Sequence, residues 1–208
     1  MVEKIHIVMC LWKRIKNIKS IIENINNQTF SSRIVFHLLN NNPEYKNVIG
    51  PFNKANNICI AHYNNQYSCF QRYFYIRDNI SSDYVIIVDD DQILHKNWVE
   101  QIYQKKKKKA LVTGGGRSWS NNKSYWKPDN KSKKFDIGFT NACIIDTEIF
   151  DKNSPLWNFP QNLPKEINIY QLDNMWLSYV LKCKLEWEIV NSDLQLKKYP
   201  DTERVALY

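Results

Sequence analysis

An uninterrupted apolar run that ends in three consecutive carboxylates constrains this chain more than any other feature. Tyr84 to Val88 reads YVIIV, and Asp89, Asp90 and Asp91 follow it directly. A β-branched stretch without a polar break is typical of a strand buried on both faces of a parallel sheet. The three acids would then lie at the carboxyl end of this strand, which is the edge where ligands bind in open α/β sheets.

The acidic triplet predicts a cation site. Three adjacent carboxylates repel one another, so a cation among them would favour the folded chain. Hard oxygen ligands at a strand end suit Mg²⁺ or Mn²⁺, which usually share their coordination shell with substrate phosphates. Asp91 could instead cap a helix that begins near His95. Because one carboxylate suffices for a cap, the triplet favours the metal interpretation.

Composition predicts one packed α/β domain of 208 residues, since 43% of the residues are hydrophobic and 13% aromatic. No apolar run approaches the ~20 residues that a membrane span needs. The N-terminal residues go straight into strand-like sequence without a signal-peptide core. The cysteines are scattered without a Cys-x-x-Cys pair, which predicts reduced thiols and a cytoplasmic protein. They are Cys10, Cys59, Cys69, Cys143 and Cys183.

The positive charge of the chain raises the question of nucleic-acid binding. The formal net charge is +8 at pH 7, and Lys105 to Lys109 form a basic run. This run follows a helix predicted over 98–104, whose last carbonyls favour cations. A nucleic-acid-binding module would also leave the acids of the buried strand unexplained. We therefore expect the lysines to form a solvated face and expect no nucleic-acid partner.

Strands and helices alternate along the chain. Strands are predicted at 4–10, 33–39, 57–63 and 84–88, and the intervening helices include one with isoleucines at helical spacing from Ile15 to Ile25. Polar residues follow the strands at one end, namely the asparagines at 40–42 and 64–65 and the three acids. This repetition predicts an open doubly wound sheet with one crevice. Further strands are predicted at 110–113, 135–145 and 185–190, a helix over 172–183, and an aperiodic basic tail from 193.

Small residues in the second half could admit a ligand. Gly114, Gly115 and Gly116 permit close approach of the backbone to a ligand or a tight turn. The stretch 138–142 is also small or polar within its predicted strand. The polar segment 118–134 is predicted to be a surface loop whose aromatic residues, Trp119, Tyr125 and Trp126, either cover a substrate or pin the loop to the body.

In combination these features resemble the GT-A glycosyltransferases, most nearly the family 2-like members, over most of the chain. The resemblance is carried by the opening strand with Arg14 beyond it, the asparagine turn at 40–42, Asn65-Gln66-Tyr67 before Arg72, Asp89-Asp90-Asp91 as the Asp-x-Asp motif, and Leu172-Asp173-Asn174-Met175-Trp176 as the region of a second acidic motif. Leu172 replaces the usual Glu. All four histidines, His6, His37, His62 and His95, precede Asp173, so water, Asp193 or Asp201 would replace the late histidine ligand.

The resemblance implies a single GT-A domain with a mostly parallel sheet flanked by helices, its nucleotide-binding half at about 1–94 and its acceptor-side half at about 95–208. It implies metal-dependent, inverting transfer of a sugar from a nucleotide-diphosphate sugar, with UDP or GDP favoured, to a glycan or other hydroxyl acceptor. Asp89 and Asp91 would hold Mn²⁺ or Mg²⁺, Asp90 would bind metal or ribose, and Asp173 would be the catalytic base. The implied donor-binding residues are Cys10, Trp12, Arg14, Asn40, Asn41, Asn65, Arg72, Asp89 and Asp90, and the sugar or acceptor candidates are Gly115, Gly116, Trp119, Asn141 and Trp176.

Two alternatives stay open at this point. An Asp in the first turn of a helix also stabilises that helix by roughly 0.5–2 kcal/mol, and Asp173 could do both. A nucleotidyltransferase or other phosphoryl-transfer enzyme also uses strand-end acids and metal. It is disfavoured because the chain has neither a P-loop pattern nor a glycine-rich N-terminal phosphate loop.

Overall fold

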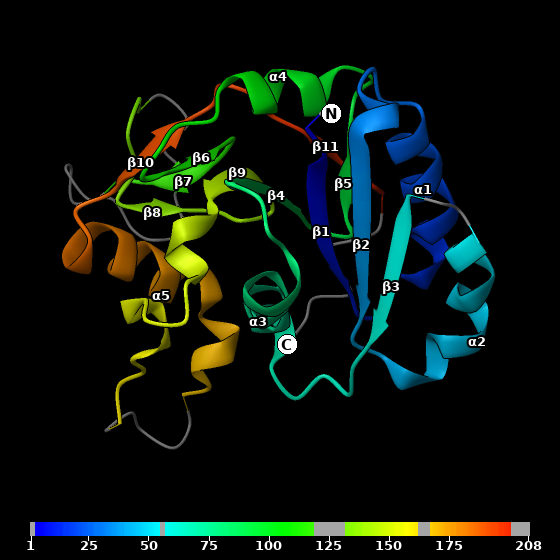
Figure 1. The fold of residues 1–208 in the computed structure, drawn as a ribbon, viewed down its shortest axis with the longest axis horizontal. Coiled ribbons are helices and arrows are strands. Elements are labelled where there is room, and N and C mark those ends of the chain that lie inside the picture. The colour runs from blue at the N-terminus through cyan, green and yellow to red at the C-terminus, as the bar shows by residue number, and fades with distance from the viewer. Residues whose placement is uncertain (1–2, 55–56, 119–131, 162–166, 201–208) are drawn as a thin grey trace.

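The computed structural model of the chain describes residues 3–54, 57–118, 132–161 and 167–200. Its centre is a seven-stranded sheet with the strand order β10-β6-β9-β4-β1-β2-β3 (Figure 1). All strands of this sheet run in one direction except β9, which pairs antiparallel with both β4 and β6. The strands are β1 (Ile5–Leu11), β2 (Ile34–Asn40), β3 (Ile58–His62), β4 (Tyr84–Val88), β6 (Ala110–Thr113), β9 (Ala142–Asp146) and β10 (Glu188–Asn191).

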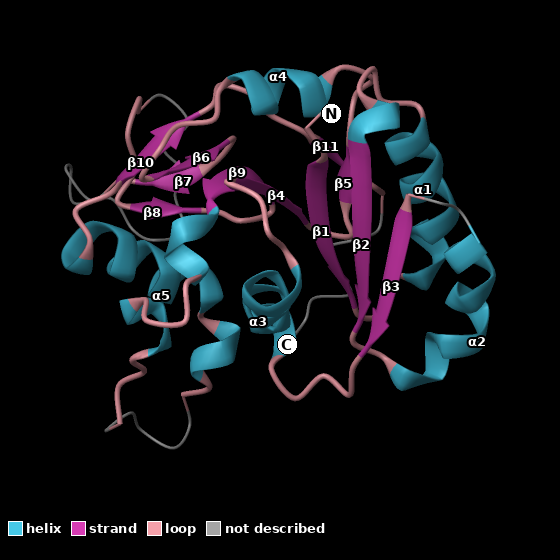
Figure 2. Cartoon of the chain, in the orientation of Figure 1, coloured by secondary structure: helices cyan, strands magenta, loops and turns pink. Residues whose placement is uncertain are grey.

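Helices cover both faces of the sheet, as Figure 2 shows. One face packs against the isoleucines of α1 and against Trp98 and Ile102 of α4. The other face packs against Tyr73 and Ile76 of α3 and against Leu177 of α5. The predicted α/β fold with a mostly parallel sheet is confirmed. The helices are α1 (Ile18–Asn26), α2 (Lys46–Ile49), α3 (Gln71–Asn79), α4 (Trp98–Gln104) and α5 (Asp173–Tyr179).

The topology brings the carboxyl ends of the parallel strands to one edge. Strand β1 lies between β2 and β4 and is parallel to both, so the strand order reverses at β1. A reversal of this kind opens a crevice beyond the strand ends, where ligands bind in doubly wound sheets. The acidic triplet directly follows β4 and therefore lies at this crevice.

The prediction of one strand over 135–145 is wrong. The segment divides into β8 (Ile137–Gly138) and β9, and β8 pairs with β7 (Gly116–Arg117) in a separate two-stranded sheet. The break has a local cause, because the Thr113 hydroxyl donates to the Phe139 carbonyl at 2.6 Å and the Phe139 amide donates to the Gly115 carbonyl at 3.0 Å. These bonds draw residues 139–141 out of the ladder and toward the acids.

The prediction of an aperiodic C-terminal tail also needs correction. Residues 197–198 form β11 (Lys197–Lys198), which pairs antiparallel with β5 (Gln92–Ile93), immediately after the acidic triplet. Leu194, Leu196 and Tyr199 pack against the hydrophobic core, which holds this segment in place. The segment 194–199 thus lies alongside the acids, and we call it the strap.

The basic run lies away from the crevice. Lys105 to Lys109 precede β6 at its amino end, where Lys108 lies 3.7 Å from Asp146 and Lys107 pairs with Glu188. The five cysteines are free. Among the described helices, none is long and apolar enough to cross a membrane.

Candidate active site

The three aspartates after β4 differ in what holds them. The Asp90 carboxylate is buried, accepting from Arg14 Nη1 at 2.5 Å and from the Trp12 amide at 3.4 Å. Asp91 accepts from Gln92 Nε2 at 2.6 Å. The Asp89 side chain is 32% exposed, against 3% for Asp90 and 9% for Asp91. Asp89 is therefore the member of the triplet that is most open to a ligand.

Asp91 does not cap a helix, so that interpretation is wrong. Helix α4 begins at Trp98, with Asn97 before it. The Asp91 carboxylate faces Lys198 of the strap at 3.5 Å and Arg14 at 3.8 Å. The carboxylate is thus directed at cations and away from the start of the helix.

Arg72 of α3 joins the acidic triplet to the second predicted acid. Its side chain is 2% exposed, and Nη1 donates to Asp89 Oδ1 at 2.8 Å. Its Nη2 donates to Asp173 Oδ2 in an ion pair and to the Thr140 hydroxyl at 2.7 Å. Residues that are far apart in sequence therefore meet at one guanidinium group.

Helix α5 begins at this meeting point. Asp173 occupies its first position, and the neighbouring Asn174 Oδ1 accepts from the Thr140 amide at 3.0 Å. The Thr140 hydroxyl also contacts Asn174 Oδ1 at 2.5 Å. Thr140 and Asn174 thereby fix the start of α5 against the loop that precedes β9. Sequence analysis did not assign a role to either residue.

The asparagines predicted to bind donor build the turns at the sheet edge. Asn40 contacts His62 at 3.1 Å, and Asn41 donates through Nδ2 to the Ser68 carbonyl at 2.9 Å. Among the described residues, Asn41 Oδ1 and Asn65 Oδ1 are buried without a hydrogen-bond partner. Asn65 also has a positive φ of 60°. Cys10, also predicted to bind donor, is a buried residue of β1.

A small cavity separates the strap from the sheet edge. Its volume is about 160 Å³, and its lining includes Gly115, Asn141, Gln195 and Lys198. Gly115 and Asn141 are thus brought beside the acids, and the Asn141 carbonyl accepts from the Asp89 amide at 2.9 Å. Gly116 instead packs closely against Phe135, where an added Cβ would meet the ring at 2.4 Å.

The two tryptophans predicted as sugar or acceptor candidates differ in what the structure describes of them. Trp176 is buried, and its indole N–H donates to the Leu156 carbonyl at 2.8 Å, so it anchors α5. Trp119 lies outside the described residues, as do Tyr125 and Trp126.

Burial and charge repulsion act together on the acids. Burial raises the pKa of Asp89, which Arg72 opposes and the negative charge of Asp91 reinforces. Burial likewise raises the pKa of Asp90 to about 6, against the effect of Arg14. Burial also raises the pKa of the Cys10 thiol to about 12, which makes this cysteine a packing group and an unreactive thiol at neutral pH.

The triplet fits a divalent cation through Asp89 and Asp91. Both present hard oxygen ligands at the crevice, and their mutual repulsion is what a cation would relieve. Asp90 is the least exposed of the three acids, and its Oδ1 lies 2.5 Å from Arg14 Nη1, so this residue instead orients Arg14. Within the described part of the chain, no group of three or more His, Cys, Asp or Glu is placed to hold a metal. Two carboxylates are sufficient for Mg²⁺ when substrate phosphates and water complete the shell.

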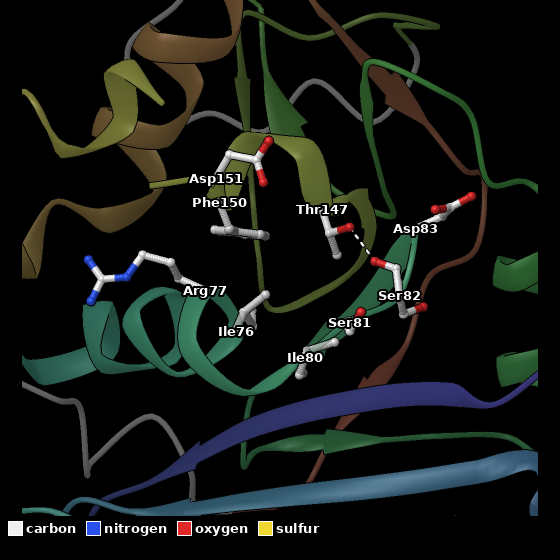
Figure 3. A pocket seen from close by; sticks show the side chains of 9 residues that line it. All are labelled: Ile76, Arg77, Ile80, Ser81, Ser82, Asp83, Thr147, Phe150 and Asp151. Carbon is white, nitrogen blue, oxygen red and sulfur yellow. Dashed lines mark hydrogen bonds between the residues drawn. The ribbon is translucent and has the colours of Figure 1, made fainter. Parts of the chain in front are cut away.

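A second polar cavity lies at the opposite end of β4. It has a volume of about 300 Å³ and lies between the end of α3, the link into β4 and the turn after β9 (Figure 3). The Thr147 hydroxyl donates to the Ser82 carbonyl at its wall. Because this cavity is at the amino end of the strand, it is separated from the acids and from Arg72.

The crevice at the strand-order reversal, with acids that arginines hold in place, agrees with the kind of site expected of a sugar-transferring enzyme. The chain belongs to glycosyl transferase family 64, whose domain model matches residues 5–170. The resemblance to glycosyltransferases is therefore confirmed. The family 2-like assignment is not, since the matching model is that of family 64.

Two solved glycosyltransferases share the fold. The apo form of GlyE from Streptococcus pneumoniae TIGR4 has a TM-score of 0.53 and 13% identity, over 90% of this chain and 45% of its own. The mannosyltransferase PcManGT from Pyrobaculum calidifontis, in complex with GDP-Man and Mn²⁺, has a TM-score of 0.59 and 9% identity, over 91% of this chain and 55% of its own. The chain thus spans about half the length of these proteins. No curated protein matches the sequence significantly.

Proposed function

We propose that this chain uses a GT-A type of site to transfer a sugar from a nucleoside-diphosphate sugar to a hydroxyl acceptor, with a divalent cation at Asp89 and Asp91. The observation that carries the proposal is the pairing of Arg72 with both Asp89 and Asp173. This pairing places the strand-end acids and the acid of α5 around one point at the crevice. The GDP-Man and Mn²⁺ bound to the similar mannosyltransferase support the same type of donor.

Each residue near the crevice then has a distinct task. Asp89 and Asp91 hold the cation, which when bound supplies Lewis-acid stabilisation of the departing diphosphate. Arg14, oriented by Asp90, and the turns built by Asn40 and Asn41 form the nucleoside side of the crevice. Arg72 adds fixed positive charge close to the reacting centre, and such preorganised charge stabilises the transition state without reorganisation.

The stereochemical course depends on Asp173. Inversion, which the resemblance to GT-A enzymes implies, needs Asp173 to accept the proton of the attacking hydroxyl. Its Oδ2 already accepts from Arg72, so only its other oxygen is left for that proton. Proton NMR of the first product anomer tests this role. An inverted product is the result expected if Asp173 is the base, and a retained product would remove Asp173 from that role.

Titration of nucleoside diphosphates tests the metal site directly. We predict that wild-type protein binds UDP or GDP in the presence of Mn²⁺ and at least tenfold more weakly with a chelator. In Asp91→Ala this dependence on Mn²⁺ disappears, because one of two carboxylate ligands is lost. Asp83→Ala is the matched control, since Asp83 precedes β4 at the opposite end of the strand and is exposed.

The control should keep the wild-type affinity and the wild-type response to Mn²⁺. Equal binding by Asp91→Ala and wild-type protein, both responding to Mn²⁺, would remove Asp91 from the metal site. Circular dichroism of the variant confirms that any loss is local.

A further inference from the structure

The strap adds a residue to the crevice that sequence motifs do not reveal. The strap lies just after Ser192, whose amide donates to the Thr113 carbonyl at 2.8 Å, at the end of β6. It ends where the Tyr199 amide donates to the Asp91 carbonyl at 2.9 Å. Between these points β11 pairs with β5, so backbone bonds fix the strap at both ends and in its register.

Close backbone packing also locates the strap. Gly114 lies under the Leu194 carbonyl, and a Cβ added to Gly114 would meet that oxygen at 2.2 Å. A side chain at position 114 would therefore displace the strap. This contact explains one glycine of the cluster at 114–116 as a site of close backbone approach within the protein.

Lys198 extends from the strap toward the acids. Its Nζ lies 3.5 Å from Asp91 Oδ2, and its side chain is 51% exposed. An ammonium group has three donors, and the Asp91 contact engages one direction only. Lys198 also lines the cavity between the strap and the sheet edge, together with Gln92 and Asn141.

Lys198 differs in exposure from the other cations around the crevice. In the described part of the chain, the four carboxylates Asp89, Asp90, Asp91 and Asp173 face the cations Arg14, Arg72 and Lys198. Asp90 and Asp173 engage the two arginines, both of which are largely buried. Lys198 is the most exposed of the three cations. An incoming diphosphate adds further negative charge beside Asp91, and Lys198 is the accessible side-chain cation next to that carboxylate.

We infer that Lys198 is a donor-binding residue that contacts the diphosphate of the nucleotide sugar, and that the strap exists to position it. The inference rests on the proposed function, because it assigns Lys198 to the same donor site. Lys198 would contact the phosphates and not the nucleoside, because Lys198 lies beside Asp91 and not beside the asparagine turns.

Matched lysine variants test this assignment. Wild-type protein, Lys198→Gln, Lys198→Arg and Lys197→Gln are titrated with UDP, GDP, uridine and guanosine, each with Mn²⁺ and with a chelator. Lys197 is the control because it is the adjacent residue of β11, is exposed, and pairs with Ile93 in the ladder. Both positions are at the surface, so neither replacement threatens the fold.

We expect Lys198→Gln to bind the nucleoside diphosphate about tenfold more weakly, the scale of one charge-assisted hydrogen bond. Its affinity for the nucleoside alone should be unchanged. Lys198→Arg should recover most of the diphosphate affinity, and Lys197→Gln should equal wild type.

The opposite result has two distinguishable forms. Wild-type affinity, or tighter binding, in Lys198→Gln would overturn the inference and leave the donor site intact. Failure of the wild-type protein to bind either diphosphate, with or without Mn²⁺, would overturn the proposed function and the inference with it.

Discussion

At the scale of single residues, Arg72 is the side chain on which the site depends. It is almost fully buried and satisfies Asp89, Thr140 and Asp173 at once. Burying a guanidinium group destabilises the fold unless the group is paired with an acid. Removing the guanidinium then leaves its acidic partners as buried, unpaired charges, which also destabilises the fold. The sequence could propose Arg72 as a donor-binding residue, but its two acidic partners lie 17 and 101 positions away, and no local pattern encodes such pairs.

Replacement of Arg72 should therefore be destabilising. We predict that Arg72→Met lowers the free energy of unfolding by about 3 kcal/mol, since it leaves Asp173 as a buried, unpaired charge. Arg77→Met is the matched control on the same helix, because Arg77 pairs with the exposed Asp78. That change should cost less than about 1 kcal/mol. Denaturant unfolding of the two variants checks this, and equal losses would contradict the role given to Arg72.

At the scale of elements, continuous patterns gave correct bounds and interrupted ones did not. The strand 84–88 and the helix 98–104 agree with β4 and α4 residue for residue, because each is apolar or amphipathic throughout. The break before β9 depends on hydrogen bonds that join Phe139 to Thr113 and Gly115, which hydrophobic periodicity does not contain. The strap was missed for the same reason, since its only regular element is two residues long.

The interface between α3 and the sheet holds a titratable cluster. His37 Nδ1 contacts the Tyr75 hydroxyl at 2.9 Å, and His37 Nε2 contacts His6 Nδ1 at 2.9 Å. Burial lowers the pKa of His37 from its ordinary 6.5 to about 4, and His6 contributes in the same direction. Between these values the unfolded chain binds a proton that the folded chain does not. Stability from His37 is therefore lost as the pH falls through this window.

We predict that the contribution of His37 to the free energy of unfolding falls by about 2 kcal/mol when the pH is lowered from 7 to 5. Asp90, whose pKa is raised to about 6, opposes this slope, because the folded chain holds its proton more tightly than the unfolded chain. The contribution of His37 is therefore measured as the difference in unfolding free energy between wild type and His37→Phe at each pH. A difference that does not change between the two pH values would contradict the assignment.

At the scale of the whole molecule, the candidate active site and the basic run 105–109 lie at opposite edges of the sheet. The acids, Arg72 and the strap lie at the carboxyl edge, whereas the basic run pairs with Glu188 and Asp146 at the amino end of β6. The sequence indicated this division, because strand direction follows from the alternation of strands and helices. It could not place the strap at the carboxyl edge, since that arrangement depends on tertiary packing.

The basic run should consequently be dispensable for donor binding. We predict that replacing Lys105 to Lys109 with Gln leaves the affinity for a nucleoside diphosphate within about twofold of wild type. The exposed ion pairs lost are worth at most about 1 kcal/mol each. The buried Asp146 keeps the hydrogen bonds from the Lys109 and Glu148 amides, so the protein stays folded. Titration of the variant with UDP and GDP checks this. A tenfold or greater loss of affinity would mean that the donor binds at the edge that carries the basic run, which contradicts the proposed site.

The most direct test of the central claim is thermal unfolding of the wild-type protein with nucleotide sugars, each in the presence of Mn²⁺ and of a chelator. UDP-, GDP-, dTDP- and CMP-linked sugars are compared. A donor at ~100 times its dissociation constant should stabilise the fold by about 2.7 kcal/mol. The account predicts stabilisation by one class of nucleoside-diphosphate sugar, and only with Mn²⁺. No stabilisation by any donor, together with salt-sensitive binding of DNA or RNA, would contradict it.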